Sequence, residues 1–335
     1  MPDAQLSFAK SFVPAVYRRL AAVGDGQLSY KHYGARHPGG IFAIQFSDLL
    51  SSFKSLVAVV QKLQATAEPC SETEEQQLKW HTRDFLFQLM NFFECGYEIF
   101  LCFLPPLARP RPGQALHVWF KAVGYESEVA SYFRNTDPLL GRYRRFFNAL
   151  KHSSNRVSIF QFIDLRNPRK ALGFYLEGVQ ETGAIGPISE LHPVYYGLQT
   201  AWSYSLHLRN WYFLIHQISS EMDVAIQRLC SRAGTVLSLP ADPPALEEPN
   251  LFSETATAEL VRVLEDSMSV FYPQERTETI LSIGIDSDKG TLTFAGQPAG
   301  ERVIPGDGSW THRCTSRGDG FSRSWQLLYF VPVPR

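Results

Sequence analysis

The segment FLFQLMNFFECGYEIFLCFLPP, residues 85–106, decides the fold class of this chain. Its length suits a membrane span, but Asn91, Glu94 and Glu98 lie near its middle. Each carboxylate would cost about 2.5 kcal/mol or more at the centre of a bilayer. We therefore predict that the segment is a core helix of a globular protein and expect no membrane partner.

Helical patterns lie on both sides of this segment. Ser71 followed by Glu74 is a capping-box signature and predicts where the helix begins. Apolar residues recur at three- and four-residue spacing over 41–67, and an amphipathic stretch covers roughly 5–23. Asp137 and Pro138 predict the N-cap and first turn of a further helix. A long apolar helical pattern runs over 194–232, and a short one over 254–268.

Strand-like segments interrupt and follow the helices. VSIFQFIDL, ALGFYLEGV and GAIGPISEL are separated by Gly and Pro turns, and the C-terminal region is strand-rich. We therefore predict a mainly α fold, α+β overall. Its parts are an N-terminal helix and loop (1–40), a helical bundle (41–232) with a β insertion near 157–192, a Pro-rich linker (233–252) and a small α+β region (253–335).

Charge is distributed unevenly along the chain. The net charge of −1 excludes a uniformly basic protein, but residues 134–170 hold nine Lys or Arg and two acids. Residues 221–278 hold eleven acids and four arginines. This asymmetry indicates either a polyanion-facing region with a separate acidic surface, or two patches that neutralise one another in the fold. The five cysteines form no CxxC pair and no signal peptide is evident, so we expect a cytoplasmic protein.

The basic segment RYRRFFNALKHSSNR, residues 142–156, contains a chemically coherent set of side chains. Arg145, Asn148 and His152 are spaced three and then four apart, which places them on one helix face. A guanidinium can hold two phosphate oxygens at once, and an imidazole can give or take a proton near neutral pH. Asparagine can orient the imidazole or bind a ribose hydroxyl. The pattern predicts a phosphate site.

RFFNALKH, residues 145–152, resembles the signature of the HEPN superfamily, in which Arg is followed after four to six residues by His. Many members are metal-independent RNases of toxin–antitoxin, CRISPR and phage-defence systems. The resemblance implies that Arg145 steadies a phosphate, that His152 assists attack by the RNA 2′-hydroxyl and that Asn148 orients. It also implies RNA as ligand, a homodimer in which two motifs meet, and an antitoxin or defence-system partner. The residues expected to steer the RNA backbone are Arg142, Arg144, Lys151 and Arg156.

Two other Arg–His pairs fall within the spacing that the signature allows. Arg209, Asn210 and His216 form a second candidate motif, which could face the first within one bundle. Their segment LHLRNWYFLIHQ is so apolar that a structural role is favoured, with a buried arginine and a core histidine. Arg111 and His117 lie among prolines, and we interpret this match as accidental.

These observations predict a metal-independent endoribonuclease of toxin or phage-defence type. The alternative is a non-catalytic HEPN-like module whose basic helix docks nucleic acid or an acidic protein. An acid–base enzyme acting on small molecules has neither a carboxylate pair nor a nucleophile in its favour. The sequence contains no Walker loop, dinucleotide fingerprint or HExxH, so we expect neither cofactor nor metal.

Overall fold

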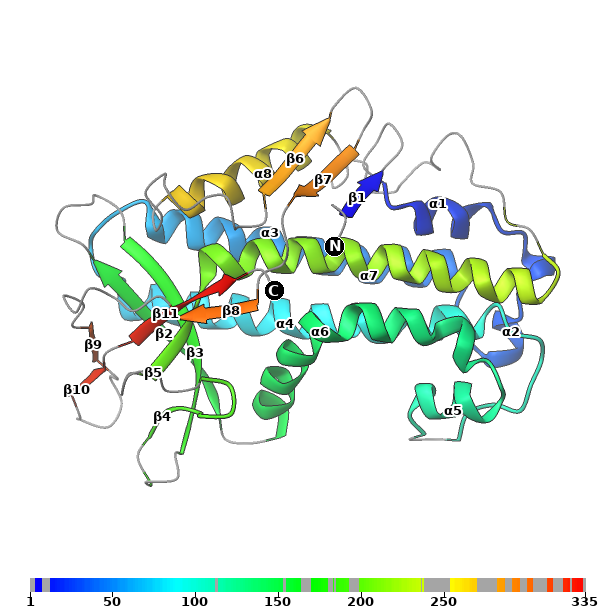
Figure 1. The fold of residues 1–335 in the computed structure, drawn as a ribbon, viewed down its shortest axis with the longest axis horizontal. Helices are drawn as coiled ribbons and strands as arrows, with labels where there is room; N and C mark the ends of the chain where they lie inside the picture. The colour runs from blue at the N-terminus through cyan, green and yellow to red at the C-terminus, as the bar shows by residue number, and fades with distance from the viewer. Residues whose placement is uncertain are drawn as a thin grey trace.

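The computed structural model shows a helical bundle with a sheet at one end (Figure 1). It describes residues 4–7, 13–111, 114–152, 155–163, 170–179, 183, 185–192, 199–235, 237, 254–269, 282–286, 291–295, 300–303, 312–315, 322–325 and 327–333. Every structural statement below concerns these residues.

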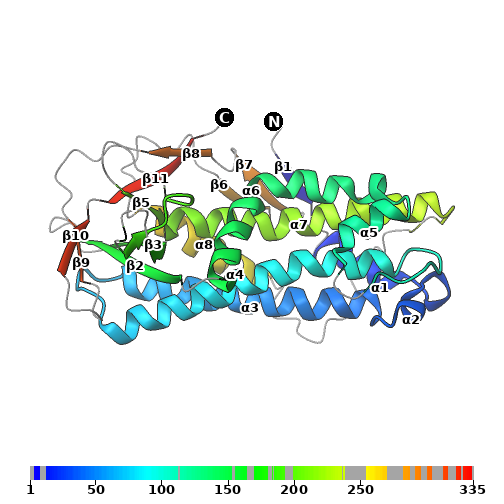
Figure 2. The ribbon, with the colours of Figure 1, turned by 90° about the horizontal axis from the view of Figure 1, so that it is seen from below.

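Four long helices lie side by side and form the body (Figures 1 and 2). They are α3 (Pro38–Gln64), α4 (Glu72–Leu101), α6 (Glu126–His152) and α7 (Tyr204–Arg232). The shorter ones are α1 (Ala15–Ala22), the 3-10 helix η1 (Asp25–Gln27), α2 (Tyr30–Tyr33), α5 (Leu116–Ala122) and α8 (Glu254–Ser269). Helix α4 packs against α3, α6 and α7, and it begins at the predicted Ser71–Glu74 capping box. The prediction of a core helix is therefore confirmed.

The main sheet has the strand order β2–β3–β5–β11–β8, with β4 paired to β3. Strand β11 runs parallel to β5, and the other pairs are antiparallel. Strands β1, β7 and β6 form a second, antiparallel sheet, and β9 pairs with β10. The bounds are β1 (Ala4–Ser7), β2 (Arg156–Ile163), β3 (Lys170–Val179), β4 (Ile185–Pro187), β5 (Gln199–Ser203), β6 (Ser282–Asp286), β7 (Thr291–Ala295), β8 (Gly300–Val303), β9 (His312–Thr315), β10 (Ser322–Trp325) and β11 (Leu327–Val333).

The predicted mainly α fold with a small β part is confirmed, but its regions are more interwoven than the predicted ranges suggest. N-terminal β1 pairs with β7, and C-terminal β11 pairs with β5, which directly precedes α7. Helix α1 packs on α7, and α8 packs on α3 and α7. Such long-range pairings leave no local pattern in the sequence, which is why 253–335 reads as a separate part. Of the predicted linker, residues 236 and 238–252 lie outside the described residues.

Several predicted helix boundaries are wrong. Helix α6 runs unbroken through Asp137 and Pro138, where the sequence predicts a new start. An interior proline removes one backbone hydrogen bond and clashes with the preceding turn, so the helix bends instead of ending. Figure 1 shows this bend. The pattern over 194–232 becomes β5 followed by α7, and the stretch over 5–23 becomes β1 and α1.

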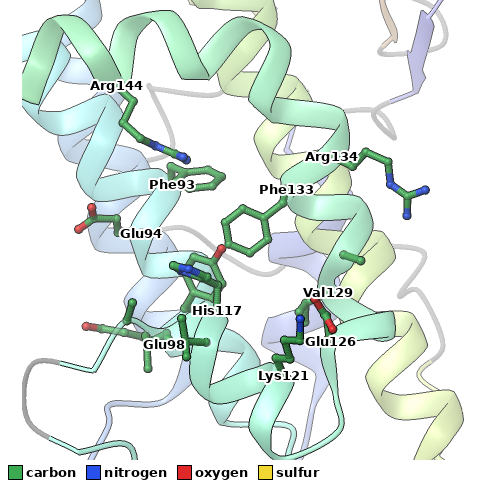
Figure 3. A pocket seen from close by; sticks show the side chains of 15 residues that line it. Phe93, Glu94, Glu98, His117, Lys121, Glu126, Val129, Phe133, Arg134 and Arg144 are labelled. Atoms are coloured by element: carbon green, nitrogen blue, oxygen red, sulfur yellow. The ribbon is translucent and has the colours of Figure 1, made fainter.

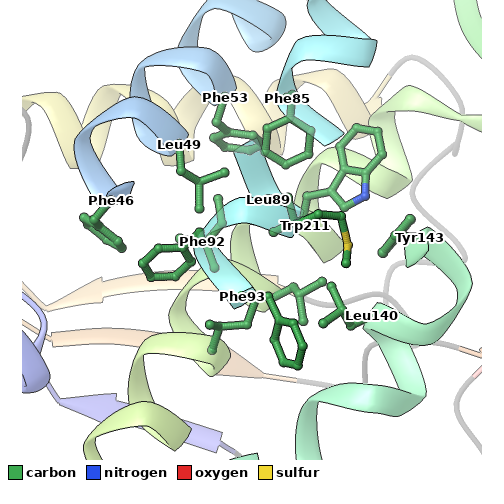
Figure 4. Packing of buried hydrophobic residues seen from close by; sticks show 14 of the residues in the cluster. Phe46, Leu49, Phe53, Phe85, Leu89, Phe92, Phe93, Leu140, Tyr143 and Trp211 are labelled. Atoms are coloured by element: carbon green, nitrogen blue, oxygen red, sulfur yellow. The ribbon is translucent and has the colours of Figure 1, made fainter. Parts of the chain in front are cut away.

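The core of the bundle is strongly aromatic (Figure 4). Phe53, Phe85 and Trp211 are fully buried. The ring centroids of Phe85 and Trp211 lie 4.9 Å apart, and Phe53 stacks on Tyr212 at 5.7 Å. Burying one such side chain stabilises a fold by about 1.5–3 kcal/mol, so these contacts between α3, α4 and α7 are a main source of stability.

Helix α3 is the one described helix that is long and apolar enough, by length and composition, to cross a membrane. Its most apolar window has a mean hydropathy of 1.3, and 44% of that window is buried inside the protein. Core helices of soluble proteins have the same properties, so a single helix of this kind is weak evidence for a membrane span.

Gly96 provides a test of the packing between α4 and α6. A Cβ atom at Gly96 would lie 2.5 Å from the Tyr132 hydroxyl oxygen and 2.7 Å from its Cζ. Tyr132 is fully buried, and its hydroxyl donates to the Phe93 carbonyl at 2.7 Å. We expect Gly96→Ala to lower the free energy of unfolding by about 1–3 kcal/mol, because overpacking outweighs the gain in helix propensity.

The matched control is Gly40→Ala in α3, where an added Cβ meets nothing within 4 Å. This substitution should stabilise the protein slightly, because alanine is the better helix former. Urea denaturation of both variants measures the difference. Equal stability of the two variants would contradict the close approach of α4 and α6.

Candidate nucleic-acid interface

The exposed face of α6 carries Arg145 and Asn148 of the first predicted motif. Arg145, Asn148 and Lys151 are exposed, whereas Tyr143 and Phe146 on the opposite face are buried in the bundle. Among the described residues, none forms a hydrogen bond or an ion pair with Arg145 or Asn148. We call positions 145, 148 and 152 the α6 stripe. Position 152 ends α6 and lies on this stripe by its spacing, but the His152 side chain lies outside the described part of the structure.

The other predicted RNA contacts lie in different surroundings. Arg142 is half-buried, and its charge helps to lower the pKa of two buried histidines, His192 and His207. Arg156 lies opposite Glu177 in the β2–β3 pair and forms an ion pair with its carboxylate. Arg144 lines a groove, described below. The structure therefore divides this set, and Lys151 is the member that lies exposed near the α6 stripe.

The second candidate motif lies in the core. Arg209, Asn210 and His216 are 3%, 5% and 5% exposed. Burial lowers the pKa of His216 to about 3, and its ring packs edge-on against Tyr212 at 4.7 Å. The Arg209 Nε donates to the Leu264 carbonyl of α8 at 3.4 Å. These positions agree with the structural interpretation of the segment and leave no room for RNA at the pair.

The two motifs do not face one another. Helix α7 meets α6 through His207, whose Nδ1 lies 2.8 Å from the Tyr143 hydroxyl, and through Trp211. Arg209 instead faces α8. A composite site within one bundle is therefore not formed between them.

Aromatic and histidine rings from β5, α6, α7 and the turn after β4 meet where the bundle joins the main sheet. Trp202 of β5 stacks on Phe146 at 5.0 Å and on His207 at 5.0 Å. His192 lies 5.3 Å from Trp202, and its Nε2 accepts from the Leu176 backbone N–H at 2.9 Å. Burial, with help from nearby Arg142, lowers the pKa of His192 to about 3. These neutral imidazoles are structural, and no spacing pattern in the sequence indicates them.

A groove of about 990 Å³ lies between α4, α5 and the bent α6 (Figure 3). We call it the α4–α6 groove. The half-buried ring of Phe133 lies at its centre, beside the buried Phe93 and Tyr97. The Arg144 guanidinium carbon lies 5.0 Å above the Phe93 ring centroid. His117 of α5 packs edge-on against Phe133 at 5.8 Å.

The α4–α6 groove has charges of both signs at its rim. The acidic side chains Glu94 and Glu98 project from successive turns of α4, so the polar stripe that argued against a membrane span lines this groove. The remaining charged side chains of the rim are Lys121, Glu126, Arg134 and Arg144. An arrangement of aromatic surface with a few charged groups is typical of sites for planar polar ligands.

Sequence reasoning missed this groove as a site. His117 belongs to the Arg–His match interpreted as accidental, and Arg111 is not one of the residues that line the groove. The groove exists because α6 bends and α5 docks on its concave side, which are tertiary features. Pro138 within a continuous helical pattern is the local signal that could have indicated a bend.

Within the described ranges, no group of three or more His, Cys, Asp or Glu side chains could hold a metal ion. No protein-family model, curated protein or solved structure matches this chain. The resemblance to the HEPN superfamily therefore rests on residues 145–152 and on the helical bundle that carries them.

Proposed function

We propose that this protein is a metal-independent endoribonuclease that binds RNA at the α6 stripe. One observation carries the proposal: Arg145 and Asn148 are exposed, and no described residue pairs with them. Arg19 and Arg209, by contrast, are buried and donate hydrogen bonds within the fold. The side chains of Arg145 and Asn148 are instead available to a ligand.

The proposed chemistry follows from the three residue types. Arg145 would hold two non-bridging oxygens of one phosphate through its planar fork. His152 would remove the proton of the neighbouring ribose 2′-hydroxyl, and that oxygen would attack phosphorus. The bond from phosphorus to the 5′-oxygen breaks, leaving a 2′,3′-cyclic phosphate and, after protonation, a 5′-hydroxyl. The arginine charge stabilises the transition state without a metal.

The resemblance extends the proposal to biological context. It favours a cytoplasmic toxin or phage-defence effector controlled by an antitoxin or another defence protein. In a homodimer, the α6 stripes of two copies would meet and share one RNA phosphate. Lys151 lies exposed beside the stripe and would add an attraction to the RNA backbone that weakens with salt.

The test is RNA cleavage in EDTA by the wild-type protein, Arg145→Ala and His152→Ala, with analysis of the product ends. We expect cyclic phosphate ends from the wild type and a loss of rate of about 100-fold or more in each variant, as is usual when general acid–base groups are removed. Arg262→Ala removes the same charge from an exposed position on α8 and should leave the rate unchanged.

Equal cleavage by all four proteins would mean that a contaminant cuts the RNA, and it would exclude the proposal. RNA binding that depends on Arg145 but is never followed by cleavage would favour the non-catalytic module that docks nucleic acid. A filter-binding assay on the same samples separates these outcomes.

A further inference from the structure

We propose that the α4–α6 groove binds a guanine base, with the phosphate of the same nucleotide at Arg144. The inference rests on the proposed RNA binding only for the source of the base, which could be an unpaired position in RNA or a free nucleotide. The groove itself is defined by the packing of α4, α5 and α6.

The size and the floor of the groove suit a nucleobase. Its volume of about 990 Å³ is large enough for a nucleotide. The half-buried ring of Phe133 is held in place by Phe93 and Tyr97, with centroids at 5.8 and 4.9 Å. A fixed aromatic ring at the floor of an open groove is the usual platform for stacking an unpaired base.

The α4 wall supplies the acceptors that distinguish guanine. Glu94 and Glu98 are exposed and one helical turn apart on α4, and both line the rim of the groove, so that a ligand lying on Phe133 would meet them at its edge. Guanine presents two adjacent donors, N1–H and the N2 amino group, which match the two oxygens of one carboxylate. Uracil presents one N–H donor between two carbonyl oxygens. A carboxylate that accepts from this N–H brings its second oxygen close to a carbonyl oxygen, and the two repel each other.

Arg144 fixes the orientation of the nucleotide. Its guanidinium lies above Phe93 at one end of the groove and could donate two parallel hydrogen bonds to one phosphate (Figure 3). The three acidic side chains of the rim balance Lys121, Arg134 and Arg144, so the groove does not attract a polyanion along its whole length. A base inside and one phosphate at Arg144 satisfy this charge pattern.

The groove also has a useful position relative to the α6 stripe. Arg144 and Arg145 are consecutive, so they project about 100° apart around the helix. A strand with one phosphate on Arg145 could therefore place a neighbouring base in the groove. The guanine site would then choose where the proposed cleavage occurs.

The first measurement is calorimetric titration of the full-length protein with 5′-GMP, 5′-IMP, 5′-AMP and 5′-UMP. We expect GMP to bind at least ten-fold more tightly than UMP and AMP. IMP lacks the N2 amino group and should bind between these limits. Equal affinity for GMP and UMP would overturn the proposal.

Three variants assign the contacts. The double variant Glu94→Gln, Glu98→Gln should reduce the GMP preference to less than three-fold, because it removes both carboxylates. Phe133→Leu should weaken all four nucleotides by about ten-fold without changing their order. Arg144→Gln should abolish the advantage of GMP over guanosine. Glu259→Gln, at an exposed position on α8, is the control and should change nothing. If the double variant still prefers GMP as strongly as the wild type does, Glu94 and Glu98 are not the groups that distinguish guanine from the other bases.

A second arm identifies the source of the base. The RNA tetranucleotide UUGU is titrated in the same way. If UUGU binds more than ten-fold more tightly than GMP, and the groove variants lose this additional affinity, the natural source of the base is an RNA strand. Equal affinities indicate a free nucleotide. GMP binding is measured without cleavage, so the two proposals can fail separately. A protein that does not cleave RNA but still prefers GMP would contradict the proposed ribonuclease activity and support the guanine site in the groove.

Discussion

The free energy of unfolding should fall by about 4 kcal/mol or more as the pH is lowered from 7 to 5, because His192 and His216 remain neutral in the fold and His207 acts in the same direction. Burial lowers the pKa of both from 6.5 to about 3, and Arg142 contributes at His192. Between these values the unfolded chain binds protons that the folded chain does not. Stability therefore rises with pH in this window and falls as the medium becomes acidic.

The size of the effect follows from the two shifts. A histidine with a pKa of 6.5 when unfolded and about 3 when folded contributes about 2 kcal/mol of lost stability between pH 7 and 5. His207 acts in the same direction, because burial, Arg142 and His192 hold its pKa well below its usual value. The loss is comparable with the total stability of about 5–15 kcal/mol of a typical domain.

Urea unfolding at pH 7, 6 and 5, at constant ionic strength, measures this dependence. The variant His216→Phe keeps an aromatic ring beside Tyr212 and should lose about 2 kcal/mol less than the wild type over the same range. The quantity compared between the two proteins is the change in the free energy of unfolding from pH 7 to pH 5. A change in absolute stability caused by the substitution therefore does not affect the result. A pH dependence identical in both proteins would show that His216 is protonated in the fold.

The sequence predicted the fold class correctly because the helical signals are local. The capping box at Ser71 and Glu74 needs four consecutive residues, and α4 begins there. The predicted start of a helix at Asp137 was wrong because a proline such as Pro138 is compatible with two structures. It can occupy the first turn of a helix, or it can bend a helix that continues through it. The packing of α6 on α4 and α7 decides between these two structures, and this packing cannot be predicted from the local sequence.

The candidate site was predictable only in part. The spacing of Arg145 and Asn148 placed both on one face, and both are exposed. The same spacing at Arg209 and His216 produced a buried pair, since burial depends on neighbours such as Leu264 of α8 that are distant in sequence. The groove around Phe133 requires α4, α5 and α6 together, so no single segment indicates it.

The structure shows in part how the basic segment 134–170 and the acidic segment 221–278 are paired. Asp223, in the acidic stretch, pairs with Arg19 of α1 and not with the basic residues of α6. Arg145 and Lys151 remain exposed. Mutual neutralisation therefore does not account for these two positive charges, which is why we propose that they bind the RNA backbone.

Asp223→Ala should destabilise the protein by about 3–5 kcal/mol, the usual cost of leaving one partner of a buried ion pair without the other. Arg19 donates to this carboxylate through Nε at 2.7 Å and Nη2 at 3.2 Å, and its Nη1 donates to the Leu237 carbonyl at 2.8 Å. The side chains of Arg19 and Asp223 are 9% and 11% exposed. Arg18 beside them is also buried, so the variant would leave two adjacent guanidinium groups without this negative charge.

The double variant Arg19→Met, Asp223→Leu separates the cost of an unpaired charge from the value of the pair. It removes both charges and fills the space with apolar groups, so we expect it to recover most of the loss in urea denaturation. Asp25→Ala is the control, since Asp25 pairs with Lys31 at the surface with side chains 62% and 75% exposed, and it should leave stability unchanged. If the double variant were as unstable as Asp223→Ala, the ion pair itself, and not the desolvation of a lone arginine, would hold α1 against α7.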